Sequence, residues 1–251
     1  ELVLAERIGL SGEEIVFTSN DTPAEEFAKA KSLGAVINLD AFEHIAYLEK
    51  HVGLPPLLSF RYNPGAKRGG NDIIGKPEEA KFGMTREQLF DAYALSKSKG
   101  VKRFGLHTMV VSNERDVEYF VETARMLFDI VREVREKIGI TIELVNLGGG
   151  IGIPYKPEDK EVDIETLAAG VKELYESYRL APLKLAMECG RYITGPHGYL
   201  ISRVRHIKKT YRTYAGLDAT MADLMRPAMY GAYHHITVRG KENAPADETY
   251  D

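Results

Sequence analysis

The sequence has no tryptophan and a single cysteine, Cys189. One thiol cannot form an internal disulfide, so the disulfide-stabilised class of secreted domains is excluded. No apolar run approaches the roughly 20 residues that a membrane-spanning helix needs, and no secretory signal pattern opens the sequence. We therefore expect a cytoplasmic protein without a membrane partner.

An excess of charge of either sign is also missing. The 33 basic and 37 acidic residues are mixed along the chain and give a net charge of −4. A chain without a basic patch lacks the electrostatic attraction that drives binding to nucleic acid or an anionic membrane, so neither partner is expected. An apolar fraction of 44% over 251 residues suffices for one large α/β domain, or for a large and a small domain.

Short apolar runs alternate with helical patterns, which predicts βα units and a parallel sheet. The expected strands are residues 14–18, 35–39, 57–62, 103–107, 141–147 and 183–188. Helices fill the gaps, and capping boxes at residues 22–25 and 85–88 are expected to begin two of them. A continuous apolar stripe at helical spacing follows Asn113. The glycine-rich residues 63–75 are expected to form a mobile loop.

Such units fit either an open doubly wound sheet or most of a closed barrel. We favour a TIM-like (β/α)8 barrel that lacks its first strands, because polar residues follow several expected strands at the end where barrels bind ligands. These residues are Ser19, Asn20, Arg61, Tyr62, Asn63, His107, Asn146 and Glu188. From residue 197 the pattern changes to short alternating runs. The sequence thus predicts a barrel domain over residues 1–196 and part of a β-rich domain over residues 197–251, within a longer polypeptide.

The most informative segment is the expected strand that ends at Glu188 and continues through Cys189 and Gly190 to Arg191. An isolated buried charge costs several kcal/mol or shifts its pKa until it is neutral. Either the two charged side chains form an ordinary buried ion pair, or the carboxylate holds a cationic ring nitrogen and the guanidinium an anion. A nucleophilic Cys189 is disfavoured because no histidine lies near it in sequence.

A second candidate site consists of Gly148, Gly149 and Gly150, which follow the strand at residues 141–147. Successive glycines let backbone N–H groups converge on a phosphate, and a helix N-terminus directly afterwards would add its dipole. The alternative is a tight turn between strand and loop. A dinucleotide-binding fingerprint does not fit, because Ile153 stands where its third glycine is required.

Two polar residues near the fourth expected strand are further candidates. His107 ends that strand and is either functional or a hydrogen-bonded structural histidine. Ser112, with Asn113, is predicted to cap the next helix, and the same geometry would hold a phosphate oxygen.

Residues 226–235 are dense in groups that recognise small anions, among them Arg226 and Tyr230. The adjacent histidines at positions 234 and 235 do not predict a metal site, because neighbouring residues point in opposite directions. A loop that recognises a carboxylate is the favoured interpretation.

Taken together, these residues resemble the fold type III pyridoxal-phosphate decarboxylases, the family of diaminopimelate, ornithine and arginine decarboxylases built on an alanine-racemase-like barrel. Residues 187–191 are similar to the family's Glu-Pro-Gly-Arg motif, with Cys189 in place of proline. Residues 146–152 resemble its phosphate-binding glycine loop, and residues 104–107 the strand that faces the cofactor. Residues 223–234 resemble the diaminopimelate branch rather than the ornithine branch.

The resemblance implies pyridoxal 5'-phosphate as cofactor. Glu188, paired with the pyridinium nitrogen, and His107 would be the catalytic residues. The cofactor-binding residues would be Ser112, Gly148, Gly149, Gly150, Glu188, Cys189, Gly190 and Arg191. The substrate carboxylate would be bound by Arg191, Arg226 and Tyr230. The implied activity is decarboxylation of meso-diaminopimelate to L-lysine and carbon dioxide by a homodimer.

Some features depart from the family pattern. Met109 stands where the family has a histidine that stacks on the cofactor ring. The lysine that binds the cofactor covalently would precede residue 1, and a loop donated across the dimer interface would follow Asp251, so these residues alone are not expected to decarboxylate. The open alternatives are a decarboxylase of ornithine, lysine, arginine or a carboxylated polyamine, a non-catalytic carrier of pyridoxal phosphate, and a phosphate-sugar isomerase or aldolase.

Overall fold

The computed structural model describes residues 1–68, 76, 78–245 and 248–251, so residues 69–75 of the expected glycine-rich loop lie outside it. The strands are β1 (Val16–Ser19), β2 (Val36–Leu39), β3 (Leu57–Tyr62), β4 (Arg103–Thr108), β5 (Ile142–Gly149), β6 (Lys184–Glu188), β7 (Val204–Lys209) and β8 (Thr213–Leu217). The helices are α1 (Leu2–Arg7), α2 (Ala24–Ser32), α3 (His44–His51), α4 (Arg86–Ser98), α5 (Val117–Ile138), α6 (Ile164–Ser177), α7 (Gly190–Thr194) and α8 (Arg226–Tyr230). None of the helices in these ranges has the length and apolarity needed to cross a membrane.

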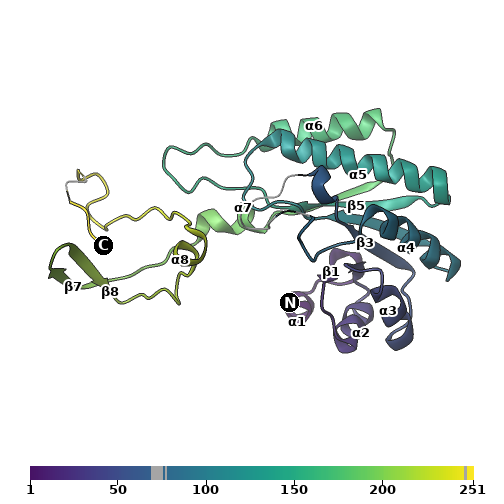
Figure 1. Cartoon of the computed structure of the whole chain (residues 1–251), viewed down its shortest axis with the longest axis horizontal. Coiled ribbons are helices and arrows are strands. Elements are labelled where there is room, and N and C mark those ends of the chain that lie inside the picture. The colour runs from purple at the N-terminus through teal and green to yellow at the C-terminus, as the bar shows by residue number, and fades with distance from the viewer. Residues whose placement is uncertain (69–75, 77, 246–247) are drawn as a thin grey trace.

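Strands β1 to β6 form one parallel sheet whose spatial order follows the sequence. A doubly wound sheet reverses its strand order at a switch point, whereas this order never reverses. The sheet curls, and helices α2 to α6 cover its outer face (Figure 1). The structure therefore confirms the TIM-like barrel and contains a half-barrel, which is open between β1 and β6 in the described part of the chain.

An ion network links strands across the end of the sheet opposite the candidate site. Arg103, at the start of β4, pairs with Glu13 at 2.6 Å and with Glu143 on β5. Lys184, on edge strand β6, lies 3.5 Å from the same Glu13, which precedes edge strand β1. The curl thus brings the two edges of the sheet close enough to share one carboxylate.

The main core lies between the sheet and its outer helices. Helix α5 turns its predicted apolar stripe inward, and Leu127 and Phe128 on it are fully buried. On α4, the buried Tyr93 donates its hydroxyl hydrogen to the carbonyl of Gly105 on β4 at 2.8 Å. Burying one such large apolar side chain contributes about 1.5–3 kcal/mol, so the helices fix the positions of the strands that carry the site.

The two predicted capping boxes have different outcomes. Thr85 and Gln88 form theirs at the start of α4, as predicted. The box predicted at residues 22–25 is wrong, because α2 begins one residue later with Pro23 as its N-cap. The hydroxyl of Thr22 is consequently buried without a hydrogen-bond partner.

The cap predicted at Ser112 and Asn113 is also wrong. Helix α5 begins only at Val117 and is capped by Asp116, whose carboxylate accepts a hydrogen bond from the N–H of Glu118 at 3.0 Å. The loop before it instead packs along the glycine segment, and Asn113 Oδ1 accepts from the N–H of Ile153 at 3.2 Å. Loop packing has therefore replaced helix capping here.

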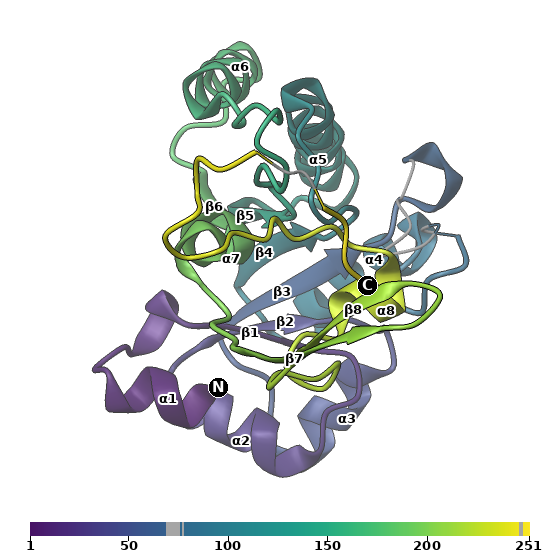
Figure 2. The same ribbon diagram turned by 90° about the vertical axis from the view of Figure 1, so that its left-hand side faces the viewer.

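The C-terminal part of the chain follows α7 and lies to one side of the half-barrel (Figures 1 and 2). Its described residues contain one antiparallel pair, β7 with β8, and the short helix α8. All side chains of β7 are exposed. The division into a barrel domain and a β-rich domain from residue 197 stays a prediction.

Candidate active site

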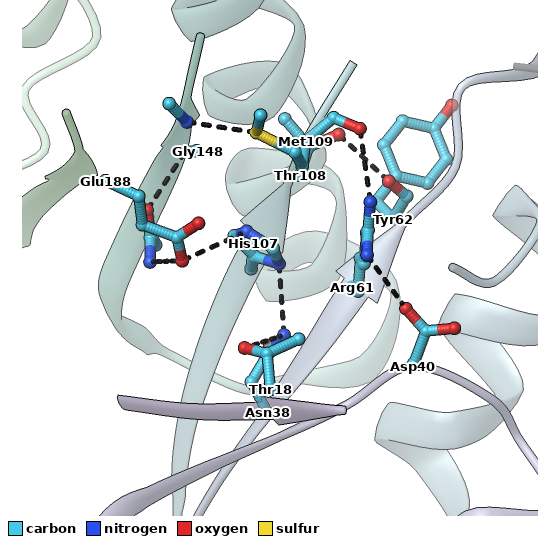
Figure 3. A network of polar contacts seen from close by, with 12 residues as sticks. Thr18, Asn38, Asp40, Arg61, Tyr62, His107, Thr108, Met109, Gly148 and Glu188 are labelled. Carbon is cyan, nitrogen blue, oxygen red and sulfur yellow. Dashed lines mark hydrogen bonds and ion pairs between the residues drawn. The ribbon is translucent and has the colours of Figure 1, made fainter. Parts of the chain in front are cut away.

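Polar residues from neighbouring strands meet on the inner side of the half-barrel, near the carboxyl ends of the strands (Figure 3). The register places Arg61 of β3 beside His107 of β4, and His107 beside Asn146 of β5. In the same way, Thr18 of β1 lies beside Asn38 of β2. Side chains in a strand alternate between faces, so the apolar neighbours point to the helices while these polar groups point inward.

His107 is only 2% exposed, so its hydrogen bonds within the chain decide how its ring is oriented. Its Nδ1 lies 3.0 Å from Nδ2 of Asn38, and the same amide nitrogen donates to the hydroxyl of Thr18 at 3.2 Å. In this amide orientation Asn38 is the donor and Nδ1 of His107 accepts, in the tautomer that carries its proton on Nε2. That N–H faces Glu188.

Glu188 ends β6 and is held by two partners. Its Oε1 accepts a hydrogen bond from Nδ2 of Asn146 at 2.9 Å and lies 3.4 Å from Nε2 of His107. His107 and Asn146, with the positive charge of Arg61, hold the pKa of Glu188 below its usual range despite its partial burial. The carboxylate therefore stays ionised at neutral pH.

The ordinary ion pair between Glu188 and Arg191 is absent from the described residues. The chain leaves β6 after Glu188 and enters α7, which turns Arg191 toward Ser112, whose hydroxyl accepts from Nη2 at 3.3 Å. Nη1 of Arg191 is buried without a hydrogen-bond partner among the described residues. Since an unpaired buried donor costs about 1–3 kcal/mol, this group points to an acceptor that the described chain does not supply.

Close packing of the backbone requires glycine at positions 148 to 150. A Cβ atom on Gly148, Gly149 or Gly150 would collide with the carbonyl oxygen of Thr108, Glu188 or Val111, respectively. Gly148 and Gly150 also have φ values of 75° and 92°, which favour glycine. The segment therefore joins the ends of β4, β5 and β6 at close range.

Two N–H groups of this segment have partners within the chain. Gly148 donates to Oδ1 of Asn146 at 2.9 Å, and Gly149 donates to the thioether sulfur of Met109 at 3.2 Å. The expected helix dipole is not beside the segment, because the next helix, α6, begins only at Ile164. A loop fills the interval, which corrects that expectation.

A buried cation, Arg61, lies beside the network. Arg61 donates to Asp40 at 3.1 Å and to the carbonyl oxygen of Met109 at 3.3 Å, and its guanidinium lies over the ring of Phe82. Burial lowers the pKa of Arg61, whereas Asp40 raises it. The sequence placed Arg61 among the polar residues at the ligand-binding ends of the strands, without a role of its own.

The remaining predicted site residues lie further along the chain. Arg226 contacts the barrel part, donating from Nη1 to the hydroxyl of Tyr155 at 3.0 Å. Tyr230, one turn after Arg226 on α8, is 55% exposed. Cys189 lies at the N-cap of α7, where burial and the charge of Glu188 raise the pKa of its thiol. In the part of the chain that the structure describes, no group of three His, Cys, Asp or Glu residues could hold a metal.

Comparison with known proteins decides the family. Residues 1–195 match the family described as pyridoxal-dependent decarboxylase, pyridoxal binding domain. The chain belongs to this family. Diaminopimelate decarboxylase from Methanothermobacter thermautotrophicus is 34% identical over 99% of this chain and 58% of that protein. Protein TabA from Pseudomonas amygdali pv. tabaci is 38% identical over 98% of this chain and likewise 58% of that protein.

Solved structures of family members have the same fold. Diaminopimelate decarboxylase from M. jannaschii, in complex with L-lysine, superposes with a TM-score of 0.82 at 30% identity, covering 93% of this chain and 56% of that one. The Helicobacter pylori enzyme, also complexed with L-lysine, gives a TM-score of 0.81 at 26% identity, covering 92% of this chain and 59% of that one. The chain thus spans a little over half the length of the relatives that it matches.

The residues present fit the cofactor in the family's description. An ionised carboxylate, Glu188, is the group that can hold a protonated ring nitrogen, and the unpaired Nη1 of Arg191 can donate a hydrogen bond to a ligand oxygen. Ser112 and Arg191 are in contact at 3.3 Å, and Gly149 pairs with Glu188 in the sheet register. Residues predicted separately from three segments therefore lie close together.

Proposed function

We propose that the protein containing this chain is a pyridoxal-phosphate-dependent amino-acid decarboxylase that converts meso-diaminopimelate to L-lysine and carbon dioxide. The observation that carries the proposal is the ionised Glu188, held by His107 and Asn146 beside the contact between Ser112 and Arg191. The names of the relatives support it, because diaminopimelate decarboxylases from Methanothermobacter thermautotrophicus and Archaeoglobus fulgidus are 34% and 32% identical to this chain.

The chain's own residues would have separate tasks. Glu188 would keep the ring nitrogen of the cofactor protonated, since its lowered pKa makes it a weak base that shares the proton without removing it. His107 and Asn146 would fix the carboxylate in place. Ser112, Gly148 to Gly150 and the segment from Cys189 to Arg191 would hold the phosphate. Bound there, pyridoxal phosphate would supply a ring that accepts electrons when carbon dioxide leaves.

The substrate assignment rests on the guanidinium groups near the site. Arg191 and Arg226 have no carboxylate partner within 4 Å among the residues that the structure describes. A substrate with two carboxylates would bind to both guanidinium groups. Ornithine, lysine and arginine have one carboxylate each and would need fewer guanidinium partners. TabA's name states no activity, so it does not discriminate between them. Tyr230 as a substrate residue, the homodimer and a cytoplasmic location stay predictions.

The test uses the full-length protein. Its absorbance spectrum is recorded before and after addition of meso-diaminopimelate, and released carbon dioxide is measured. A long-wavelength cofactor band that shifts with substrate, together with carbon dioxide release, is expected. A cofactor band without turnover of any amino acid would indicate a non-catalytic carrier of pyridoxal phosphate. The absence of a band after incubation with pyridoxal phosphate would contradict the cofactor assignment.

Substitution of one arginine separates the substrate classes. Arg226→Leu should reduce kcat/KM for meso-diaminopimelate by about 100-fold, because a charged hydrogen-bond partner of the second carboxylate is lost. Turnover of a basic monocarboxylate, if it occurs, should change much less. Equal losses for both substrates would contradict the dicarboxylate assignment.

A further inference from the structure

Tyr155 lies in the loop after β5, outside every residue group predicted for the site. Its hydroxyl accepts a hydrogen bond from Nη1 of Arg226 at 3.0 Å. The Cζ atoms of Arg226 and Arg191 lie 5.0 Å and 5.9 Å from the centre of its ring. The ring of His234 packs edge-on against it with centroids 5.4 Å apart. One aromatic residue thus contacts both arginines of the proposed substrate site.

The charges around Tyr155 are not balanced within the described part of the chain. Neither arginine has an aspartate or glutamate oxygen within 4 Å there, and Nη1 of Arg191 is buried without any hydrogen-bond partner. A tyrosine face attracts each guanidinium but does not neutralise it. Two guanidinium groups near one ring repel each other unless an anion lies between or beside them.

The hydrogen bonds also decide which edge of Arg226 remains available. Nη1 lies 3.0 Å from the Tyr155 hydroxyl and 3.2 Å from Nε2 of His234. Burial and the charge of Arg226 lower the pKa of His234, so its ring is neutral and accepts this bond. With Nη1 occupied, Nη2 and Nε of Arg226 remain as a two-pronged donor of the kind that binds a carboxylate.

We infer that Tyr155 is a positioning residue that orients Arg226 relative to Arg191, so that both guanidinium groups bind the second carboxylate of the substrate. The inference deepens the proposed function and rests on it. Tyr155 does not touch the reacting atoms; it acts through Arg226. Its loss should therefore weaken substrate binding and leave the chemical step largely unchanged.

The experiment compares full-length Tyr155→Phe, Tyr155→Leu and wild type. Tyr155→Phe keeps the ring and removes the hydroxyl, so KM for meso-diaminopimelate should rise about fivefold while kcat stays within about twofold. Tyr155→Leu also removes the ring contacts with both arginines, so a rise of about 20-fold is expected. Tyr178→Phe is the matched control, because it also removes a hydroxyl hydrogen bond, to Asp129 on α5 at 2.9 Å, outside the arginine site, and it should leave KM unchanged.

A second measurement does not depend on turnover. Pimelate has the same chain length and both carboxylates but no amino group, and L-lysine has a single carboxylate. Tyr155→Phe should weaken binding of pimelate, measured by calorimetry, by about fivefold and leave binding of L-lysine unchanged.

Unchanged KM and unchanged pimelate affinity in Tyr155→Phe would overturn the inference. So would a loss confined to kcat, or an equal loss for pimelate and L-lysine. Failure of the proposed function looks different: the wild type would then release no carbon dioxide, while the pimelate comparison would still report whether Tyr155 positions the arginines.

Discussion

At the scale of single residues, the state of Glu188 depends on what surrounds it. Its pKa is lowered chiefly by His107, with further contributions from Asn146 and Arg61. A carboxyl group whose folded pKa is depressed stays charged at pH values where a free glutamate has begun to take up a proton. The proposed partner of the ring nitrogen is therefore maintained into mildly acidic conditions.

Substitution of Asn146 tests this effect. Asn146→Ala removes one hydrogen bond to the charged form, so the pKa of Glu188 should rise and the acidic limb of the kcat profile should move to higher pH. The measurement is kcat of the full-length protein against pH. Ser98→Ala on α4, far along the chain from the site, is the control and should keep the wild-type profile. An acidic limb that stays in place would show that Glu188 does not govern it.

At the scale of secondary-structure elements, Glu133 links two helices that cover the sheet. Glu133 on α5 pairs with Arg86 on α4, and with Lys137 one turn further along α5 at 2.7 Å. These hydrogen bonds lower the pKa of Glu133 from 4.5 to about 2. Its stabilising effect is therefore fully present above the unfolded value of 4.5 and is lost as pH falls toward about 2.

Glu133→Gln should lower the free energy of unfolding at neutral pH by about 1 kcal/mol. The effect is modest because the Glu133 side chain is 26% exposed and water screens the pair. Urea denaturation is measured at neutral pH and at the acid end of the range in which the wild type stays folded. The difference between variant and wild type should shrink on acidification. A difference independent of pH would show that the carboxylate charge is not its cause.

The elements also show what sequence could and could not predict. The bounds of β3 were predicted at 57–62, because a short, mostly apolar run lies there after two prolines. Thr22 and Thr85 carry the same capping signature, yet only Thr85 caps a helix, since tertiary packing sets where α2 begins. Candidate residues Glu188, His107 and Ser112 were identified from their types and positions.

Contacts between distant segments could not be predicted from one sequence. The spacing of Glu188 and Arg191 did not reveal that the chain bends into α7 between them and turns Arg191 to Ser112. The close approach of the Thr108 carbonyl to Gly148 depends on the register of β4 with β5. The hydrogen bond from Arg226 to Tyr155 joins residues 71 positions apart, and neither position alone predicts it.

At the scale of the whole molecule, ion pairs between side chains support the curl of the sheet at the end opposite the candidate site. Arg103 bridges Glu13 and Glu143, and Glu13 also approaches Lys184. The bond from Arg103, together with the nearby positive charges, lowers the pKa of Glu13. The pairs are partly exposed, so each is worth little alone, and their effect comes from joining the strands near both open edges.

Arg103→Met should therefore lower the free energy of unfolding of the full-length protein by about 1 kcal/mol. Lys184→Met is the comparison, because the Lys184 side chain is 67% exposed and its contact with Glu13 is 3.5 Å long; its effect should be less than half as large. Urea denaturation at low and high salt provides the measurement, and salt should reduce the effect of Arg103→Met. Equal losses in the two variants would contradict a bridging role for Arg103.

Cys189 lies where β6 passes into α7, between the proposed ring-nitrogen partner and the glycine that begins the helix. A thiol whose pKa is raised reacts slowly with alkylating reagents at neutral pH, because the thiolate is the reactive form. The chain has no other cysteine, so alkylation of this peptide, followed by mass spectrometry, reports on this junction alone. Labelling kinetics of the unaltered protein can thus reveal when the site is occupied, without any introduced probe.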